Sequence, residues 1–353
     1  MRHRLRRKGG PMFSALQNLP STGRFAPSPT GKLHIGNVYT ALGAYLSTRR
    51  FPHSRFILRI EDLDTSKDTR KESEKIIENL EWLGFDWDEL VFQSQRLDIY
   101  REALKEIRDI DPEDPLLYPC SCSRKEICAQ SPADPIDGMR VYKGKCRKNP
   151  PSSSQGCSIR LKVPRAGEKR IEVRDFIFGP RIFDLEKQIG DAVLKRRDGQ
   201  FTYQLAVAVD DGIEGIGQVV RGRDLLKSSA LQIYIRRLLS LKDLRFAHLP
   251  LILENGGVKM SKSRGSADVS LLREWGASPE QIIGFCAWLM NLYPAPEPVP
   301  MGIEECVKLF SYKKVKFGPN RLKDRELPAY FSDPHWWKRS GGSYRRIEYG
   351  IYG

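Results

Sequence analysis

The chain lacks three features that would each place it in a familiar class. No apolar run approaches the roughly 18–20 residues of a membrane-spanning helix, which excludes a helical channel or transporter. The seven cysteines are an odd number, and five of them gather between positions 120 and 157, unlike the disulfide framework of a small secreted protein. No acidic residue precedes Glu61. These absences favour a soluble cytoplasmic protein whose cysteines are reduced or bind a metal.

The acid-free start of the chain is also basic, with Arg or Lys at positions 2, 4, 6, 7 and 8. No apolar core of the secretory kind follows this segment. We expect residues 1–20 to form a basic tail, or the protein to start at Met12. A transit peptide is the less favoured interpretation.

What the chain has in excess is positive charge. Its 353 residues carry 59 Lys and Arg against 44 Asp and Glu, a net charge of +15. Such a balance suits a polyanionic partner, because basic side chains displace counterions from phosphates. Solubility alone would also account for it, so the charge becomes persuasive only beside specific motifs. With 40% hydrophobic residues, we expect a folded monomer with two or three substructures and no membrane partner.

The first hundred residues alternate between strand and helix patterns. Residues 23–27 and 56–60 have strand character, whereas apolar spacing from Val38 to Leu46 and from Glu72 to Leu83 predicts amphipathic helices. Strand, helix, strand, helix is typical of a parallel α/β sheet.

This alternation stops near Asp111, where a segment rich in Pro, Cys and Ser begins. Strand character returns at residues 205–209 and 218–221, and Asp224 is expected to cap a helix that runs through Leu238. The pattern predicts a split nucleotide-binding fold with an inserted segment.

His34-Ile35-Gly36-Asn37 lies between the first predicted strand and helix. Nucleotides bind at this place in α/β sheets, because the helix N-terminus offers free N–H groups to phosphate. Gly36 allows a close backbone approach, and His34 can donate a hydrogen bond to a reacting phosphate. Taken alone, the tetrapeptide is more often an ordinary strand-to-helix turn.

A second motif, Lys259-Met260-Ser261-Lys262-Ser263, changes those odds. Glycines flank it on both sides, so it is expected to be a mobile cationic loop that closes over a triphosphate. A solvated basic loop is the ordinary alternative. The two motifs in this order are far more specific than either one.

With these motifs in place, the chain resembles the glutamyl branch of class I aminoacyl-tRNA synthetases from about residue 22 to about residue 300. The stretches that carry the resemblance are residues 24–31, 34–37, 59–62, 203–207, 220–222 and 259–263. The resemblance implies a ligase with ATP sites at His34, Gly36, Asn37, Lys259, Ser261 and Lys262, in which His34 and Lys262 are catalytic.

A glutamate substrate requires partners for its ammonium and its carboxylates. Arg24 and Arg221 suit the carboxylates, since arginine pairs with them bidentately. Glu61 suits the ammonium, and Ser28 and Tyr203 add hydroxyls. The resemblance implies that these five residues, together with Ala26, surround bound L-glutamate. Surface solvation of the arginines and a capping or ion-pair role for Glu61 are the alternatives.

The cysteine-rich segment has the local pair spacing of a zinc site. Cys120 and Cys122 are separated by one residue, and Cys146 follows at the end of the next loop. Zinc bound by such thiolates would organise an insertion that has little core of its own. By residue type, Cys128 or Cys157 would rank as the fourth ligand.

The resemblance implies a different fourth ligand. Cys-x-Cys followed by Tyr-x-x-x-Cys is the pattern of a truncated paralogue family, the glutamyl-Q tRNA(Asp) synthetases, which makes Tyr142 the ligand beside Cys146. A structural role is expected for this zinc, one per chain. Reduced cysteines without metal are the alternative.

These interpretations together predict an α/β protein: a split Rossmann-like, parallel-sheet nucleotide-binding domain with an inserted zinc-binding module and a C-terminal helical stem. The stem is expected to come from apolar residues between Trp275 and Leu289. The expected parts are a basic tail (1–21), the first half of the catalytic domain (22–114), the insertion (115–204), the second half (205–248), the motif loop and stem (249–310) and a basic tail (311–353).

The 90 residues after Ser263 leave no room for the helical anticodon-binding domain of a full glutamyl enzyme. The resemblance therefore implies tRNA-independent formation of glutamyl-adenylate from ATP, with Mg²⁺, and transfer of glutamate to queuosine at the wobble position of tRNA(Asp). Asp62 and Asp64 could bind the Mg²⁺ or cap the next helix. Two alternatives stay open: a shortened enzyme that charges the 3′ end of tRNA, and a non-catalytic RNA-binding paralogue.

Overall fold

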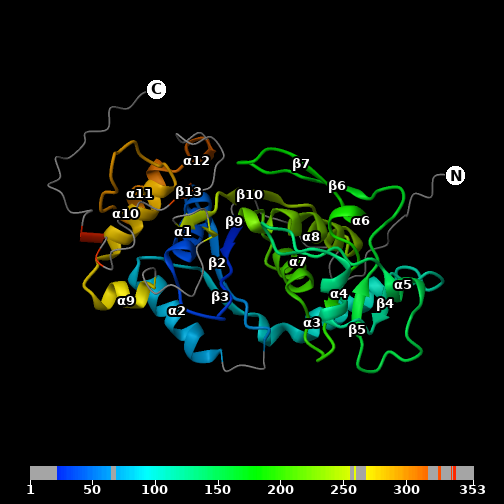
Figure 1. Cartoon of the computed structure of the whole chain (residues 1–353). Helices are drawn as coiled ribbons and strands as arrows, with labels where there is room; N and C mark the ends of the chain where they lie inside the picture. Colours follow the sequence, from blue (N-terminus) through cyan, green and yellow to red (C-terminus); the bar gives the residue numbers. More distant parts are fainter. Residues whose placement is uncertain are drawn as a thin grey trace.

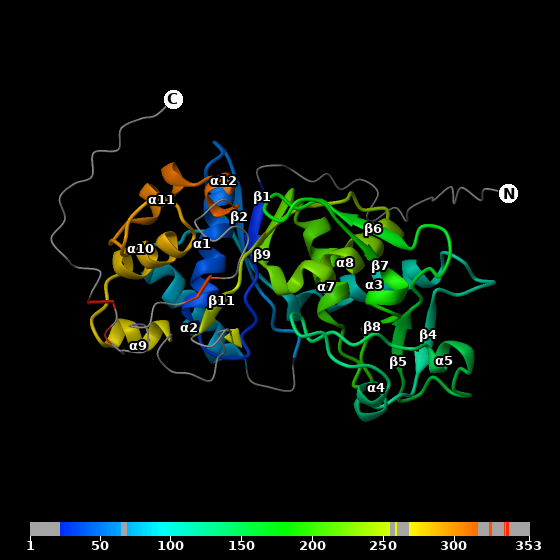
Figure 2. The same cartoon turned by 45° about the horizontal axis from the view of Figure 1, so that its top comes forward.

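The computed structural model describes residues 22–64, 69–254, 258–259, 268–316, 325–326, 335 and 337–338. Parallel strands form its centre, with the inserted segment at one end and helices α9 to α12 at the other, as Figures 1 and 2 agree. The bounds of these end helices are α9 (Val269–Glu274), α10 (Pro279–Leu289), α11 (Ile303–Leu309) and α12 (Tyr312–Lys316).

The central strands come from two distant parts of the chain. β1 (Thr22–Phe25), β2 (Arg55–Ile60) and β3 (Glu89–Phe92) pair in parallel, as do β9 (Gln218–Gly222) and β10 (Arg245–Leu249). β9 lies beside β1, where the Gly217 N–H donates to the carbonyl of Thr22 at 3.1 Å. The parallel α/β arrangement and the predicted split between its halves are therefore present.

Both faces of these strands are covered, because successive side chains of a strand pack into different apolar clusters. In β2, Phe56, Leu58 and Ile60 belong to one apolar cluster, while Ile57 points to the other. Since successive strand side chains face opposite sides, each cluster covers one face. Two cores thus hold the strand ends that form the cavity described below.

The first face packs against α1 (Ile35–Arg49), α2 (Arg70–Trp82) and α10. α1 contacts both β1 and β9 and so spans the two halves. Gly23 permits this packing, because a β-carbon at that position would lie 2.0 Å from the Thr48 hydroxyl oxygen. The helices expected at 38–46 and 72–83 and the stem helix packed on the catalytic body are confirmed.

The second face packs against α3 (Leu97–Arg108), α7 (Tyr203–Ile213) and α8 (Leu226–Leu238). Short 3₁₀ turns, η1 (Gln93–Arg96) and η2 (Arg223–Leu225), precede α3 and α8. α7 contacts both α3 and α8, so both halves of the chain contribute to this core.

Between α3 and α7 the chain forms small antiparallel units. β4 (Leu117–Cys120), β5 (Ser158–Leu161) and β8 (Ala192–Lys195) make one sheet, and β6 (Arg170–Val173) and β7 (Arg181–Asp184) make a hairpin. The remaining short elements are α4 (Arg124–Gln130), α5 (Lys145–Lys148), α6 (Leu185–Gln188), β11 (Ile252–Glu254), β12 (Val258–Lys259) and β13 (Arg325–Glu326).

Two expectations for the second half were wrong. Residues 205–209 are not a strand but the middle of α7, because a short apolar run that is buried on every side fits either element. Asp224 does not cap α8, since it lies inside η2 and Leu225 occupies the capping position. None of the described helices is long and apolar enough to cross a membrane.

Candidate functional site

A cavity of about 710 Å³ opens where β1 and β9 end and α1 begins. This volume lies within the range of small-molecule sites. Of the residues expected around glutamate and ATP, those with a described side chain all line it: Arg24, Ala26, Ser28, His34, Gly36, Asn37, Glu61, Tyr203 and Arg221. Of the second motif, Lys259 lies in β12 without a described side chain, and Ser261 and Lys262 lie outside the described residues.

The start of α1 forms one wall of the cavity. His34 occupies the N-cap in an extended conformation, and its backbone N–H donates to the Asn37 side-chain oxygen at 3.1 Å. No acidic residue lies in the first turn of α1, so the positive end of the helix dipole is not neutralised by its own sequence. An anion entering the cavity therefore meets a favourable helix terminus.

Arg24 at the end of β1 is buried, and Asp211 of α7 accepts from its Nε at 3.0 Å. The pairing fixes the guanidinium at the cavity wall. Burial would raise the pKa of Asp211, but Arg24 and Arg59 outweigh it and hold that pKa well below its usual range. Asp211 is thus an ionised anchor for Arg24.

Arg24 belongs to a larger cluster, here called the buried ion network, that sequence reasoning did not find. The fully buried Arg59 of β2 donates to Asp211 at 2.9 Å and to Glu214 at 2.7 Å. The network consists of Arg24, Arg59, Arg96, Asp210, Asp211 and Glu214.

The outer part of this network closes on Asp210 and Glu214. Arg96 reaches both carboxylates, at 3.1 and 2.9 Å. Asp210 also accepts from the Gln93 amide at 2.7 Å and from the Tyr100 hydroxyl at 2.8 Å. Buried charges are tolerated only when paired and hydrogen-bonded in this way.

Glu61 lies after β2, and its side chain is only 7% exposed. The Ser28 hydroxyl donates to it at 3.4 Å, and Arg59 is 3.8 Å away. Burial raises the pKa of Glu61 to about 7, against the opposing pull of Arg59 and Arg24. A cationic group in the cavity would favour its ionised form, so Glu61 is suited to bind an ammonium.

Arg221 at the end of β9 also lines the cavity and is 4% exposed. Its Nη1 donates to the Tyr203 hydroxyl oxygen at 3.2 Å, and its Nη2 donates to Ser229 at 2.6 Å and to Gln232 at 2.8 Å. The site therefore presents, besides Arg24, a second cation that is held by several partners. Asp62 lies away from these contacts, since both its oxygens accept from Ser94.

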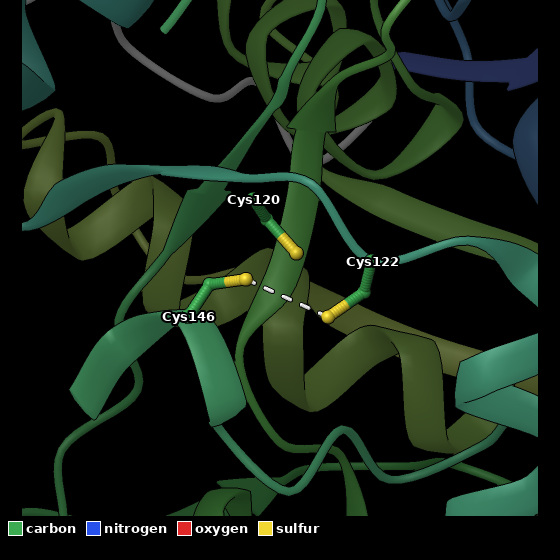
Figure 3. A group of neighbouring side chains, drawn as sticks. All are labelled: Cys120, Cys122 and Cys146. Carbon is green, nitrogen blue, oxygen red and sulfur yellow. Dashed lines mark hydrogen bonds between the residues drawn. The ribbon is translucent and has the colours of Figure 1, made fainter. Parts of the chain in front are cut away.

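The cysteine cluster lies in the inserted segment. The sulfurs of Cys120, Cys122 and Cys146 point toward one another (Figure 3) and all lie within 4.8 Å, with 3.5 Å between those of Cys122 and Cys146. Ligands of tetrahedral zinc with bonds of about 2.3 Å would lie about 3.8 Å apart. The three side chains can therefore hold such an ion.

Tyr142 completes the cluster. Its hydroxyl oxygen is 3.5 Å from the Cys120 sulfur and 3.4 Å from that of Cys122, and it accepts from the Cys146 N–H at 2.8 Å. Gly190 lies against the Tyr142 backbone in a left-handed conformation, and an added β-carbon there would lie 2.8 Å from the Tyr142 nitrogen.

The two cysteines that residue type ranked above Tyr142 lie outside the cluster. Cys128 is exposed on α4 and Cys157 is partly exposed. Burial would raise the pKa of the Cys146 thiol, but hydrogen bonds from Tyr142 and Ser121 lower it to about 6. A thiolate is the form that binds metal.

Residues 22–314 match the model of the family described as tRNA synthetases class I (E and Q), catalytic domain. The chain is 37% identical over 325 residues to the glutamyl-Q tRNA(Asp) synthetase of Symbiobacterium thermophilum, covering 87% of this chain and 97% of that protein. The enzyme of the same name from Aromatoleum aromaticum is 41% identical over 254 residues, 72% of this chain and 77% of its own.

Glutamate–tRNA ligases are also similar. That of Aquifex aeolicus is 37% identical over 312 residues, covering 86% of this chain and 64% of the ligase. A crystal structure of a glutamate tRNA ligase from Elizabethkingia meningosepticum with its amino acid matches at a TM-score of 0.70 and 28% identity, over 90% of this chain and 69% of that one. The chain therefore belongs to the class I tRNA synthetases for glutamate and glutamine, a family of ligases.

Proposed function

We propose that this protein activates L-glutamate with ATP, without tRNA, and transfers the glutamate to the queuosine base at the wobble position of tRNA(Asp). The observation that carries the first step is the cavity itself. Two buried arginines and a buried carboxylate face it beside a helix N-terminus, which matches the charges of glutamate and a triphosphate.

At the amino-acid end, Arg24 and Arg221 attract the carboxylates of glutamate, while Glu61 accepts from its ammonium. Ser28 and Tyr203 add hydroxyl contacts, and the short side chain of Ala26 lets the substrate lie close to the backbone. The arginines are buried and held by their own partners, so they need little reorganisation when the substrate enters. Orientation of the α-carboxylate toward ATP follows from this preformed arrangement.

At the nucleotide end, Gly36 and Asn37 at the α1 N-terminus, together with Lys259, Ser261 and Lys262, bind ATP. The α-carboxylate oxygen attacks the α-phosphorus, the bond to the bridging oxygen breaks, and pyrophosphate leaves. His34 and Lys262 stabilise the charge that develops on the phosphate oxygens. Mg²⁺ would neutralise part of the triphosphate charge.

The cysteine cluster is assigned a structural zinc ion held by Cys120, Cys122, Tyr142 and Cys146. The Tyr142 hydroxyl oxygen lies 3.5 and 3.4 Å from the sulfurs of Cys120 and Cys122, and the three sulfurs lie within 4.8 Å of one another, which supports this set. Burial raises the pKa of Tyr142, so the phenol would lose its proton only when the metal binds. The ion would fix the insertion, residues 115–204 in our division of the chain, between the halves 22–114 and 205–248.

The second step, transfer to queuosine, rests on the names of the similar enzymes and on the Cys-x-Cys and Tyr-x-x-x-Cys pattern. The acceptor hydroxyl attacks the carbonyl carbon of glutamyl-adenylate, and AMP leaves. The basic surface expected from a net charge of +15 suits a tRNA in the cytoplasm.

The experiment is glutamate-dependent exchange of pyrophosphate into ATP, first without tRNA and then with it. Exchange without tRNA, followed by labelling of queuosine-containing tRNA(Asp), is the expected result. Exchange that requires tRNA and ends in charged tRNA(Glu) would instead support the second candidate, a shortened glutamate–tRNA ligase, which the similarity to the Aquifex aeolicus enzyme favours. No exchange under either condition would leave an RNA-binding paralogue.

A further inference from the structure

Arg221 is held by more than its cavity neighbours. Behind it lies His248 in β10, which is fully buried, and behind His248 lies the carboxylate of Asp175, also fully buried. Asp175 follows β6, so it belongs to the inserted segment and not to the central strands.

The inserted segment reaches this position because it extends the sheet. Around β10, the Phe246 N–H donates to the Arg174 carbonyl at 3.1 Å and the Phe176 N–H donates to the Phe246 carbonyl at 2.8 Å. Asp175 lies between these two bonds and forms a parallel bridge with Phe246. These backbone contacts therefore place the Asp175 side chain against the Nδ1 edge of the His248 ring.

Asp175 fixes which nitrogen of His248 carries the proton. Its Oδ2 lies 2.6 Å from His248 Nδ1 and also accepts from the His248 backbone N–H at 2.9 Å. Its Oδ1 accepts from the N–H groups of Ile177 and Phe178 at 2.9 and 2.7 Å. An acceptor-only carboxylate at Nδ1 requires Nδ1–H and leaves a lone pair on Nε2.

That lone pair faces Arg221. The Arg221 Nε–H donates to His248 Nε2 at 3.3 Å, and the Ser229 hydroxyl lies 3.1 Å from the same nitrogen. Burial lowers the pKa of His248, which keeps the ring neutral beside a guanidinium. In the other tautomer Nε2–H would point at Arg221 Nε–H, and two donors would meet.

The remaining donors of Arg221 show what this placement achieves. Nη2 is occupied by Ser229, Gln232 and the Leu225 carbonyl, at 2.6, 2.8 and 3.3 Å. Nη1 has two protons and, among the described acceptors, only the Tyr203 oxygen. With Nε and Nη2 engaged at the back, the guanidinium presents one Nη1–H beside the Tyr203 hydroxyl to the cavity.

We propose that Asp175 and His248 are positioning residues for glutamate binding: Asp175 holds His248 in the Nδ1–H tautomer, and the acceptor at Nε2 holds Arg221 so that Nη1 and the Tyr203 hydroxyl together receive a carboxylate. The inference rests on the proposed glutamate site. It replaces the bidentate guanidinium contact expected of Arg221 by a two-point contact shared with Tyr203.

The test compares two substitutions at the same buried position in the exchange assay. His248→Leu removes the acceptor and should raise KM for glutamate about tenfold, as the loss of a buried hydrogen-bond partner does. KM for ATP should stay within about twofold, since the nucleotide end is untouched. His248→Gln can place an oxygen near the Nε2 position and should restore KM for glutamate to within about threefold.

Asp175→Asn tests the tautomer. The amide has one acceptor oxygen instead of two, so its N–H₂ group can face His248 Nδ1 in place of an oxygen. A donor at Nδ1 favours the tautomer that is protonated at Nε2. Histidine nitrogen-15 chemical shifts, assigned by the signal lost in His248→Gln, should show Nδ1–H in the wild type and a shift toward Nε2–H in Asp175→Asn, with raised KM for glutamate.

Ile107→Ala in α3 is the control for lost stability, since Ile107 is buried in the second core away from Arg221. It should lower the melting temperature without changing KM for glutamate. An unchanged KM in His248→Leu, or an equal rise in KM for ATP, would overturn the positioning role. If the wild type shows no glutamate-dependent exchange, the proposed function fails, while a wild-type Nε2–H signal would separately overturn the placement of Arg221.

Discussion

The buried ion network and the cysteine cluster are both polar assemblies inside the protein, but they differ in what supports them. The network lies on the face of the strands that packs against α3 and α7, beside a large apolar core, and each of its arginines faces carboxylate oxygens at 2.7 to 3.1 Å. The cysteine cluster makes up most of a small, separate apolar cluster of five buried residues: Tyr118, Cys120, Cys122, Tyr142 and Cys146. One assembly carries its own counterions, whereas the other gathers three thiols and a phenol that lie against one another.

This difference predicts how each region responds to change. An ion network with internal counterions is part of the folded body and loses stability when one charge is removed. A set of thiols that binds a metal depends on the added ion, so its order should follow metal and pH and not the stability of the whole chain. The following predictions test this distinction.

The largest effect is expected from Arg59→Met. Removing this cation takes away the arginine that Asp211 and Glu214 share. Breaking a buried ion pair in this way lowers the free energy of unfolding by about 3–5 kcal/mol. Denaturant unfolding measures it. Arg70→Met is the matched control, because Arg70 is 85% exposed and its pair with Glu74 contributes at most about 1 kcal/mol. Equal losses in the two variants would show that the network does not support the fold.

Sequence reasoning identified the cavity but not the ion network, and the physical reason is distance along the chain. Motifs at strand ends were predictable, because parallel strands bring their carboxyl ends to one edge. The partner of Arg59 lies 152 positions away, and no local pattern encodes such a pairing. The available signal was a charged residue inside the apolar run 56–60, which requires a buried counterion.

The same reasoning explains the error in α7. Residues 205–209 are apolar throughout because the helix is buried, so the run showed no helical period. The Asp210-Asp211 pair that follows ends the apolar run, and both carboxylates are buried against arginines, Asp211 against Arg24 and Asp210 against Arg96. For the fourth ligand of the cysteine cluster, residue type favoured Cys128 or Cys157. Both lie outside the cluster in the structure.

The second prediction concerns the cysteine cluster. Purified protein should contain about one zinc per chain, and Cys120→Ser should lose most of it, because three remaining donors bind the ion weakly. Elemental analysis measures the metal, and limited proteolysis between residues 121 and 157 measures local order. The unfolding transition of the central strands should persist in the variant.

Cys157→Ser is the control, since Cys157 lies outside the cluster and its loss should leave the zinc in place. Wild-type protein that is free of metal yet resists proteolysis in this region would contradict the contrast between the two assemblies. Retention of zinc in Cys120→Ser would show that the ion binds elsewhere.

The third prediction separates groups that bind the ground state from one that acts on the transition state. Lys262→Ala should slow adenylate formation by at least about tenfold while KM for glutamate changes little, as expected when a transition-state contact is lost. Lys308→Ala, an exposed lysine of α11, is the control for lost charge. Normal turnover in Lys262→Ala would remove this residue from the proposed mechanism.

The smallest expected effect is the pH dependence of kcat/KM for glutamate that arises from Glu61. Its pKa is raised to about 7 by burial, so the ionised form needed for the substrate ammonium is lost as the pH falls through 7. Between pH 8 and 6.5, kcat/KM for glutamate should fall about fourfold, because kcat/KM reports the free enzyme. Ser28→Ala should keep this fall, since it alters the hydroxyl but leaves the carboxyl in place. Glu61→Gln should lower kcat/KM at every pH and abolish the fall. A persisting fourfold change in Glu61→Gln would assign the titration to another group and leave the ammonium without its proposed partner.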